Sequence, residues 1–70
     1  MDVLVFKTNL RFKKNIDQIS SSMEKLPGVQ KWNVDRHDID KVLRIEASGL
    51  SPRIVETLLK DVGFYCEELL

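Results

Sequence analysis

Apolar residues recur at spacings of three and four in the first third of the chain, a pattern typical of one face of an α-helix. We expect this helix to end at Pro27-Gly28, because proline cannot continue the hydrogen-bond ladder and glycine tolerates a positive φ. The favoured start of this helix is Leu10, with Asn9 as its N-cap. Asn15, paired with Gln18, is the alternative cap. The apolar face consists of Phe12, Ile16, Ile19, Met23 and Leu26.

A second helix is predicted near the end of the chain, with clear signals at both ends. Ser51 is the expected N-cap, Pro52 the first helical residue, and Leu50 is expected to contact Val55. Gly63 is expected to end the helix, with Phe64 folding back onto Leu59 in a Schellman motif. The predicted buried stripe is Ile54, Val55, Leu58, Leu59 and Val62.

Strands are predicted at residues 3–6, 29–34, 42–47 and 64–69, and alternation indicates their buried sides. Trp32 and Val34 share one face of the second strand. The polar turn at 36–40 favours an antiparallel hairpin between the second and third strands. In the third strand the expected inward residues are Leu43, Ile45 and Ala47, and the outward ones are Arg44 and Glu46.

The order strand, helix, strand, strand, helix, strand predicts an α+β fold in which right-handed crossovers place both helices on one face of a four-stranded antiparallel sheet. This is the ferredoxin-like βαββαβ sandwich, and residues 1–70 are expected to form a single domain. The other sheet face is left open. Val3 and Val5, or Leu4 and Phe6, point there, which predicts a contact surface for a protein partner or for a homodimer.

Composition narrows the function further. The formal net charge is zero, which argues against nucleic-acid and anionic-membrane partners. The single cysteine, Cys66, excludes an internal disulfide and favours a reducing compartment. The first residues lack the basic region and length of a signal peptide, and no apolar run approaches the roughly 20 residues of a membrane span. We therefore expect a cytoplasmic protein.

The stretch NIDQISSSMEKLPGVQKWNVD and the closing VGFYCEEL have an order and spacing that resemble a known family. The chain is similar to the heavy-metal-associated (HMA) domain of copper chaperones and metal-transporting ATPases over nearly its whole length. In that family a Met-x-Cys-x-x-Cys loop opens the first helix, and its two thiolates hold Cu(I) or Zn(II). The resemblance implies a ferredoxin-like fold and a metal loop at this position.

Counted back from Pro27-Gly28, the family's methionine position falls on Leu10, and its two cysteine positions fall on Phe12 and Asn15. None of these residues is a soft-metal ligand. We therefore predict a degenerate HMA-like domain with no metal and no cofactor, in which Phe12 covers the core where the metal would lie.

Other candidate sites are weaker. Cys66 is expected to be a buried small apolar residue, and His37 to belong to a solvated turn with Asp35, Asp38 and Asp40. Residual metal handling through Cys66 and His37 is the alternative hypothesis. Four cations near the first helix N-terminus form a candidate anion or partner contact, namely Lys7, Arg11, Lys13 and Lys14.

Catalysis is not expected. Acylphosphatases share this topology and use an arginine and an asparagine, but the Gly-rich phosphate loop that would accompany Arg11 and Asn33 is absent. A Ser-His-Asp set is absent as well. RNA-recognition domains also share the topology, but Leu43 and Ile45 stand where stacking aromatics would be needed. The sequence therefore favours a non-catalytic interaction or regulatory module.

Overall fold

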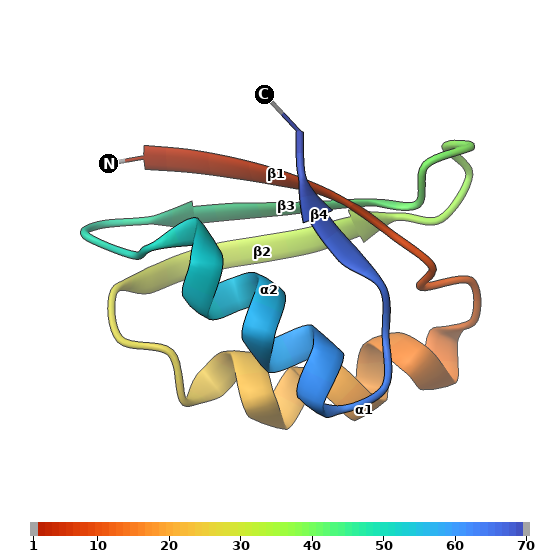
Figure 1. Cartoon of the computed structure of the whole chain (residues 1–70), viewed down its shortest axis with the longest axis horizontal. Coiled ribbons are helices and arrows are strands. Elements are labelled where there is room, and N and C mark those ends of the chain that lie inside the picture. The colour runs from red at the N-terminus through yellow and green to blue at the C-terminus, as the bar shows by residue number, and fades with distance from the viewer. Residues whose placement is uncertain (1, 70) are drawn as a thin grey trace.

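The chain forms a four-stranded antiparallel sheet with two helices on one face (Figure 1). A computed structural model describes residues 2–69. The strands lie in the order β2-β3-β1-β4, and neighbouring strands are antiparallel throughout. The predicted ferredoxin-like fold is confirmed. The elements are β1 Asp2–Thr8, α1 Lys13–Glu24, β2 Val29–Asp35, β3 Val42–Ala47, α2 Pro52–Asp61 and β4 Cys66–Glu68.

The core lies between the sheet and the helices, and strand alternation decides which residues enter it. The three residues predicted to face inward on β3 are fully buried. On β1 the inward residues are Leu4 and Phe6, whereas Val3 is 49% exposed on the open face, which settles the alternative that the sequence left. The fully buried apolar residues include Phe6, Leu10, Ile19, Leu43, Ile45, Ala47, Val55 and Leu59.

The first helix begins later than predicted. It starts at Lys13, because Leu10 is fully buried in the core and the chain stays extended up to Phe12. The Phe12 N–H donates to the Asn15 side-chain oxygen at 3.0 Å, so Asn15 caps the helix from inside its first turn. Asn9, the predicted cap, instead accepts the Tyr65 N–H at 3.0 Å.

The predicted ends of α2 are confirmed. The Ser51 hydroxyl accepts the Arg53 N–H at 3.3 Å, and Pro52 is the first helical residue. At the other end the Phe64 N–H donates to the Leu59 carbonyl at 2.9 Å, and the Gly63 N–H donates to the Lys60 carbonyl at 3.0 Å. These two bonds define a Schellman motif.

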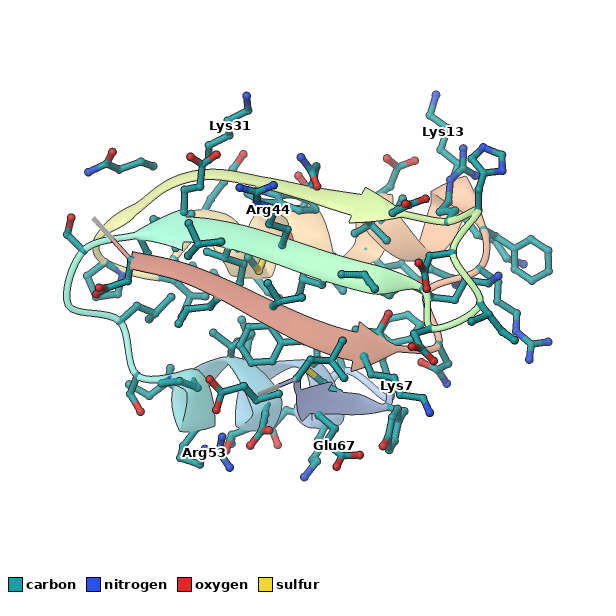
Figure 2. All side chains as sticks on the ribbon, turned by 90° about the horizontal axis from the view of Figure 1, so that it is seen from above. Lys7, Lys13, Lys31, Arg44, Arg53 and Glu67 are labelled. Carbon is teal, nitrogen blue, oxygen red and sulfur yellow. The ribbon has the colours of Figure 1, made fainter. Side chains whose placement is uncertain are left out.

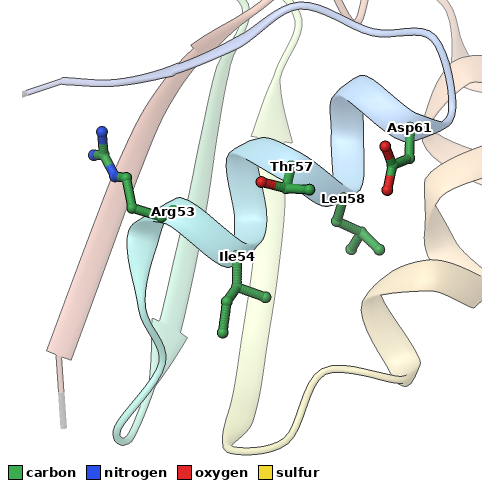
Figure 3. A pocket seen from close by; sticks show the side chains of 5 residues that line it. All are labelled: Arg53, Ile54, Thr57, Leu58 and Asp61. Carbon is green, nitrogen blue, oxygen red and sulfur yellow. The ribbon is translucent and has the colours of Figure 1, made fainter.

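The buried stripe of α2 is narrower than predicted. Ile54 is 51% and Val62 is 42% exposed, because the helix turns Val55 and Leu59 toward the sheet and leaves its flanks in solvent. Ile54 and Leu58 point to the same side of α2 (Figure 3), where they line a shallow hollow of about 340 Å³.

Glu56 is a buried residue of α2 that the sequence pattern did not predict. Its carboxylate accepts the Glu68 N–H of β4 at 2.8 Å and pairs with Arg53 at 3.1 Å. Arg53 also reaches the Glu68 carboxylate at 2.6 Å. Glu56 and Arg53 thus link α2 to β4. The strand β4 covers three residues, Cys66–Glu68, and is shorter than the predicted 64–69.

We predict that Gly28→Ala destabilises the fold more than Gly63→Ala does. Both glycines have a positive φ, which costs an alanine about 1–2 kcal/mol. Only at Gly28 would the added Cβ also lie 2.3 Å from the Ser48 carbonyl oxygen, because the Ser48 N–H donates to the Gly28 carbonyl at 3.0 Å and holds the two backbones together. Urea unfolding of both variants measures the difference, and equal losses would contradict the prediction.

We also predict that Glu56→Ala lowers the free energy of unfolding by about 1–3 kcal/mol, because it leaves the Glu68 N–H without its acceptor. Glu56→Gln keeps an acceptor oxygen and should lose less. Glu24→Ala, which removes an exposed glutamate from α1, is the matched control. Urea unfolding measures the losses. A loss for Glu56→Ala no larger than that of the control would show that the bond between Glu56 and the Glu68 N–H does not stabilise the fold.

Candidate functional site

The loop between β1 and α1 lies at the same end of the molecule as the β2–β3 turn (Figure 1). Buried Thr8 joins these two segments. Its N–H donates to the Asp40 carbonyl at 3.0 Å, and its hydroxyl donates to the Lys41 carbonyl while accepting the Leu10 N–H. The relative positions of the loop and the turn are therefore fixed by one residue. We call this region the loop end.

The three positions that the resemblance aligned with an HMA metal loop have separate structural roles. Leu10 is fully buried in the core, and Asn15 accepts the Phe12 N–H. Phe12 is 59% exposed, so the prediction that it covers the core is wrong. As the N-cap of α1 it has an extended backbone that turns its ring outward, where the Lys14 ammonium lies 5.7 Å from the ring centroid. Leu10 fills the core instead.

The β1–α1 loop and the β2–β3 turn border an open hollow of about 510 Å³. Of the four cations that the sequence predicted to gather here, only Arg11 lines it. Lys7 pairs with Asp40 at 3.6 Å, and Figure 2 shows Lys7 and Lys13 on opposite sides of this end. The full lining is Thr8, Asn9, Arg11, Phe12, Arg36, Ile39 and Lys41.

Arg36 and Lys41 are lining residues that the sequence analysis missed. They lie in the turn that follows β2, 25 and 30 residues after Arg11, so no local spacing links them to Arg11. The topology was the available signal, since the loop after the first strand and the turn of the central hairpin share one end of this fold.

The acidic residues of the β2–β3 turn fold the turn itself. The Asp35 carboxylate accepts the N–H groups of His37 at 3.0 Å and Asp38 at 3.2 Å. The Asp38 carboxylate accepts the Asp40 N–H at 2.8 Å. Such side-chain bonds to the next backbone amides are typical of aspartate in turns. Within residues 2–69, no three His, Cys, Asp or Glu side chains are grouped so that they could hold a metal ion.

Cys66 faces the core from β4 and is only 1% exposed. Burial, and secondly the Glu56 carboxylate, raise the pKa of the thiol from 9.0 to about 12. The thiol therefore stays protonated at neutral pH, which suits a packing role and not a ligand or a nucleophile. His37 is exposed in the β2–β3 turn. Cys66 is thus buried and His37 is exposed in a turn, as predicted.

Comparison with known proteins identifies the fold. Neither a scan against models of protein families nor a search of curated proteins finds a match. Two solved structures match with a TM-score of 0.83 and 17% sequence identity. One, described as "Crosstalk between Cu(I) and Zn(II) homeostasis", aligns with 99% of this chain and all of its own. The other, the N-terminal domain of PacS from Synechocystis PCC6803, aligns completely in both directions.

At this level of identity the likeness establishes the fold. The chain is thus a small α+β protein of the ferredoxin-like class, with the architecture that the resemblance to HMA domains implied. No helix within residues 2–69 has the length and apolar character needed to cross a membrane.

The buried thiol generates a prediction about alkaline stability. Because the folded protein holds the Cys66 proton more tightly than the unfolded chain does, the stability that it contributes is complete below the unfolded pKa of 9.0 and is lost as the pH rises toward 12. We expect the free energy of unfolding to fall more steeply above pH 9 in the wild type than in Cys66→Ala. Tyr65, whose pKa is raised chiefly by its hydrogen bond to Glu67, is present in both proteins. Parallel pH profiles would contradict the prediction.

Proposed function

We propose that this protein is a non-catalytic, HMA-like binding module that does not hold a metal with thiolates and acts through contacts with a ligand or partner. One observation carries the proposal: the three positions of the metal loop are used for a core residue, an exposed ring and a helix cap, namely Leu10, Phe12 and Asn15. A reducing compartment such as the cytoplasm suits its single buried thiol.

The chemistry of the loop supports the absence of a soft-metal site. Cu(I) and Zn(II) in such loops require thiolates, and neither an aliphatic side chain nor a phenyl ring supplies an electron pair for coordination. The only polar candidate, Asn15, uses its side-chain oxygen to accept the Phe12 N–H. Lys14 places a positive charge beside the same loop. A metal cation would therefore meet repulsion and no suitable ligand.

The placement of the other reactive groups supports a non-catalytic role. Arg11 lines the hollow, but Asn33 lies on the open sheet face opposite Arg44, so it does not join Arg11 as an acylphosphatase pair would. The raised pKa of Cys66 opposes its use as a nucleophile.

Two surfaces are available for contacts. At the loop end, Phe12 and Ile39 are the most exposed large hydrophobic residues of the described chain, at 59% and 91%. On the open sheet face, Val3 and Val5 stand opposite Glu46 and Arg44, so the apolar strip of this face is narrow and bordered by charge. Arg44 is labelled in Figure 2. A protein partner or a second copy on the sheet face stays a prediction, and the exposed apolar groups favour the loop end.

A metal titration tests the proposal. We expect Cu(I) and Zn(II) to leave the amide NMR signals of residues 10–16 of the reduced wild type unchanged, because the loop lacks soft ligands. The double variant Phe12→Cys/Asn15→Cys should gain tight metal binding, because it places two thiolates in the first turn of α1, where the helix dipole favours negative charge.

Cys66→Ser in both backgrounds controls for the native thiol. Metal-dependent shifts in wild-type residues 10–16 would refute the loss of the metal site. A correctly folded double variant that does not bind metal would instead show that this loop does not have the geometry of an HMA metal site.

A further inference from the structure

The hollow at the loop end gathers positive charge from two separate segments. Arg11 comes from the β1–α1 loop, and Arg36 and Lys41 come from the β2–β3 turn. No carboxylate lines the hollow. In the described chain the side-chain ion pairs use Lys7 and Arg53, so these three cations are free of carboxylate partners. The lining of the hollow thus carries three cations and no anion.

The acidic residues of the same turn offset part of this positive potential, but none of them lines the hollow. Asp40 pairs with Lys7 at 3.6 Å. Asp35 and Asp38 accept backbone N–H groups within the turn at 2.8–3.2 Å. Their carboxylates are thus engaged outside the lining, and the cations that face the hollow remain available to an anion.

The cations are carried on a fixed frame. Thr8, which is 5% exposed, bonds to the backbone of Asp40 and Lys41 and so ties the turn to β1. The backbone of Lys41 has a φ of 47°, in the left-handed region. Its ammonium donates one bond to the Asp38 carbonyl at 3.1 Å, which holds the side chain in place and leaves two N–H donors.

Two of the remaining lining residues are apolar. The ring of Phe12 and the side chain of Ile39 border the same hollow as the cations and are among the most exposed apolar groups. The volume of about 510 Å³ lies in the range typical of small-molecule sites. The planar guanidinium group of an arginine can donate two parallel hydrogen bonds to two oxygens of a phosphate group.

We propose that this hollow binds a phosphate monoester that carries an apolar group. Arg11, Arg36 and Lys41 contact the phosphate oxygens, while Phe12 and Ile39 cover the apolar group. The proposal deepens the proposed function and rests on it, because it gives a ligand class to the loop end, where Phe12 and the three cations lie.

A titration with phenyl phosphate, followed by amide NMR and calorimetry, tests the proposal. We expect saturable shifts in residues 8–12 and 36–41, and weaker binding of inorganic phosphate and of phenol, since each supplies only half of the contacts. Arg36→Gln should weaken phenyl phosphate binding about tenfold or more, because a hydrogen bond to a charged group is lost. Arg11→Gln should act similarly.

Lys13→Gln and Lys31→Gln are the matched controls, since each removes one exposed charge that does not belong to the lining. They should weaken binding about twofold or less, as expected for exposed charges screened by salt. Equal losses in all four variants, or the absence of saturable binding, would overturn the proposal. So would tighter binding of an acidic peptide than of phenyl phosphate, which would assign the hollow to a protein partner.

The metal titration separates the two proposals. If metal leaves residues 10–16 unshifted and phenyl phosphate does not bind, only the ligand assignment fails. If metal binds the wild-type loop, the proposed function fails whatever the anion titration shows.

Discussion

The position of β1 in the sheet is the constraint on which the rest of the structure depends. β1 pairs with β3 from Asp2 to Phe6 and with β4 from Phe6 to Thr8, so it joins the hairpin to the C-terminal strand. Phe6 lies in both pairings and is fully buried. Through β1, two halves of the chain that are distant in sequence share one core, and the same strand delivers Thr8 to the loop end.

Much of the fold could be predicted because local signals and the tertiary structure agree. The local signals that the folded chain follows are the alternation of residues 42–47, the helix start at Ser51-Pro52 and the helix end at Gly63. The misses occur where packing overrides the local pattern. Phe12 fits the helical period, but the folded chain buries Leu10 and leaves Phe12 exposed as the N-cap, so the helix begins after Phe12.

The candidate site was less predictable, because it is made by segments that the sequence keeps apart. Proximity along the chain suggested a cluster of Lys7, Arg11, Lys13 and Lys14, but a strand and a helix point their side chains in different directions. The hollow joins Arg11 to Arg36 and Lys41 through the backbone bonds of Thr8, which a pattern of residue types does not encode. The buried Glu56 was missed for a similar reason, since its partner Glu68 lies in another element.

The contact between Glu56 and Glu68 also bears on how the sheet can be extended. Sheet edges are templates for further strands, and β4 and β2 are the two edges of this sheet. At the β4 edge the Glu56 carboxylate already occupies the Glu68 N–H, the donor that an incoming strand would need. The β4 edge thus resists strand addition, and with it edge-to-edge aggregation, through a side chain of the neighbouring helix.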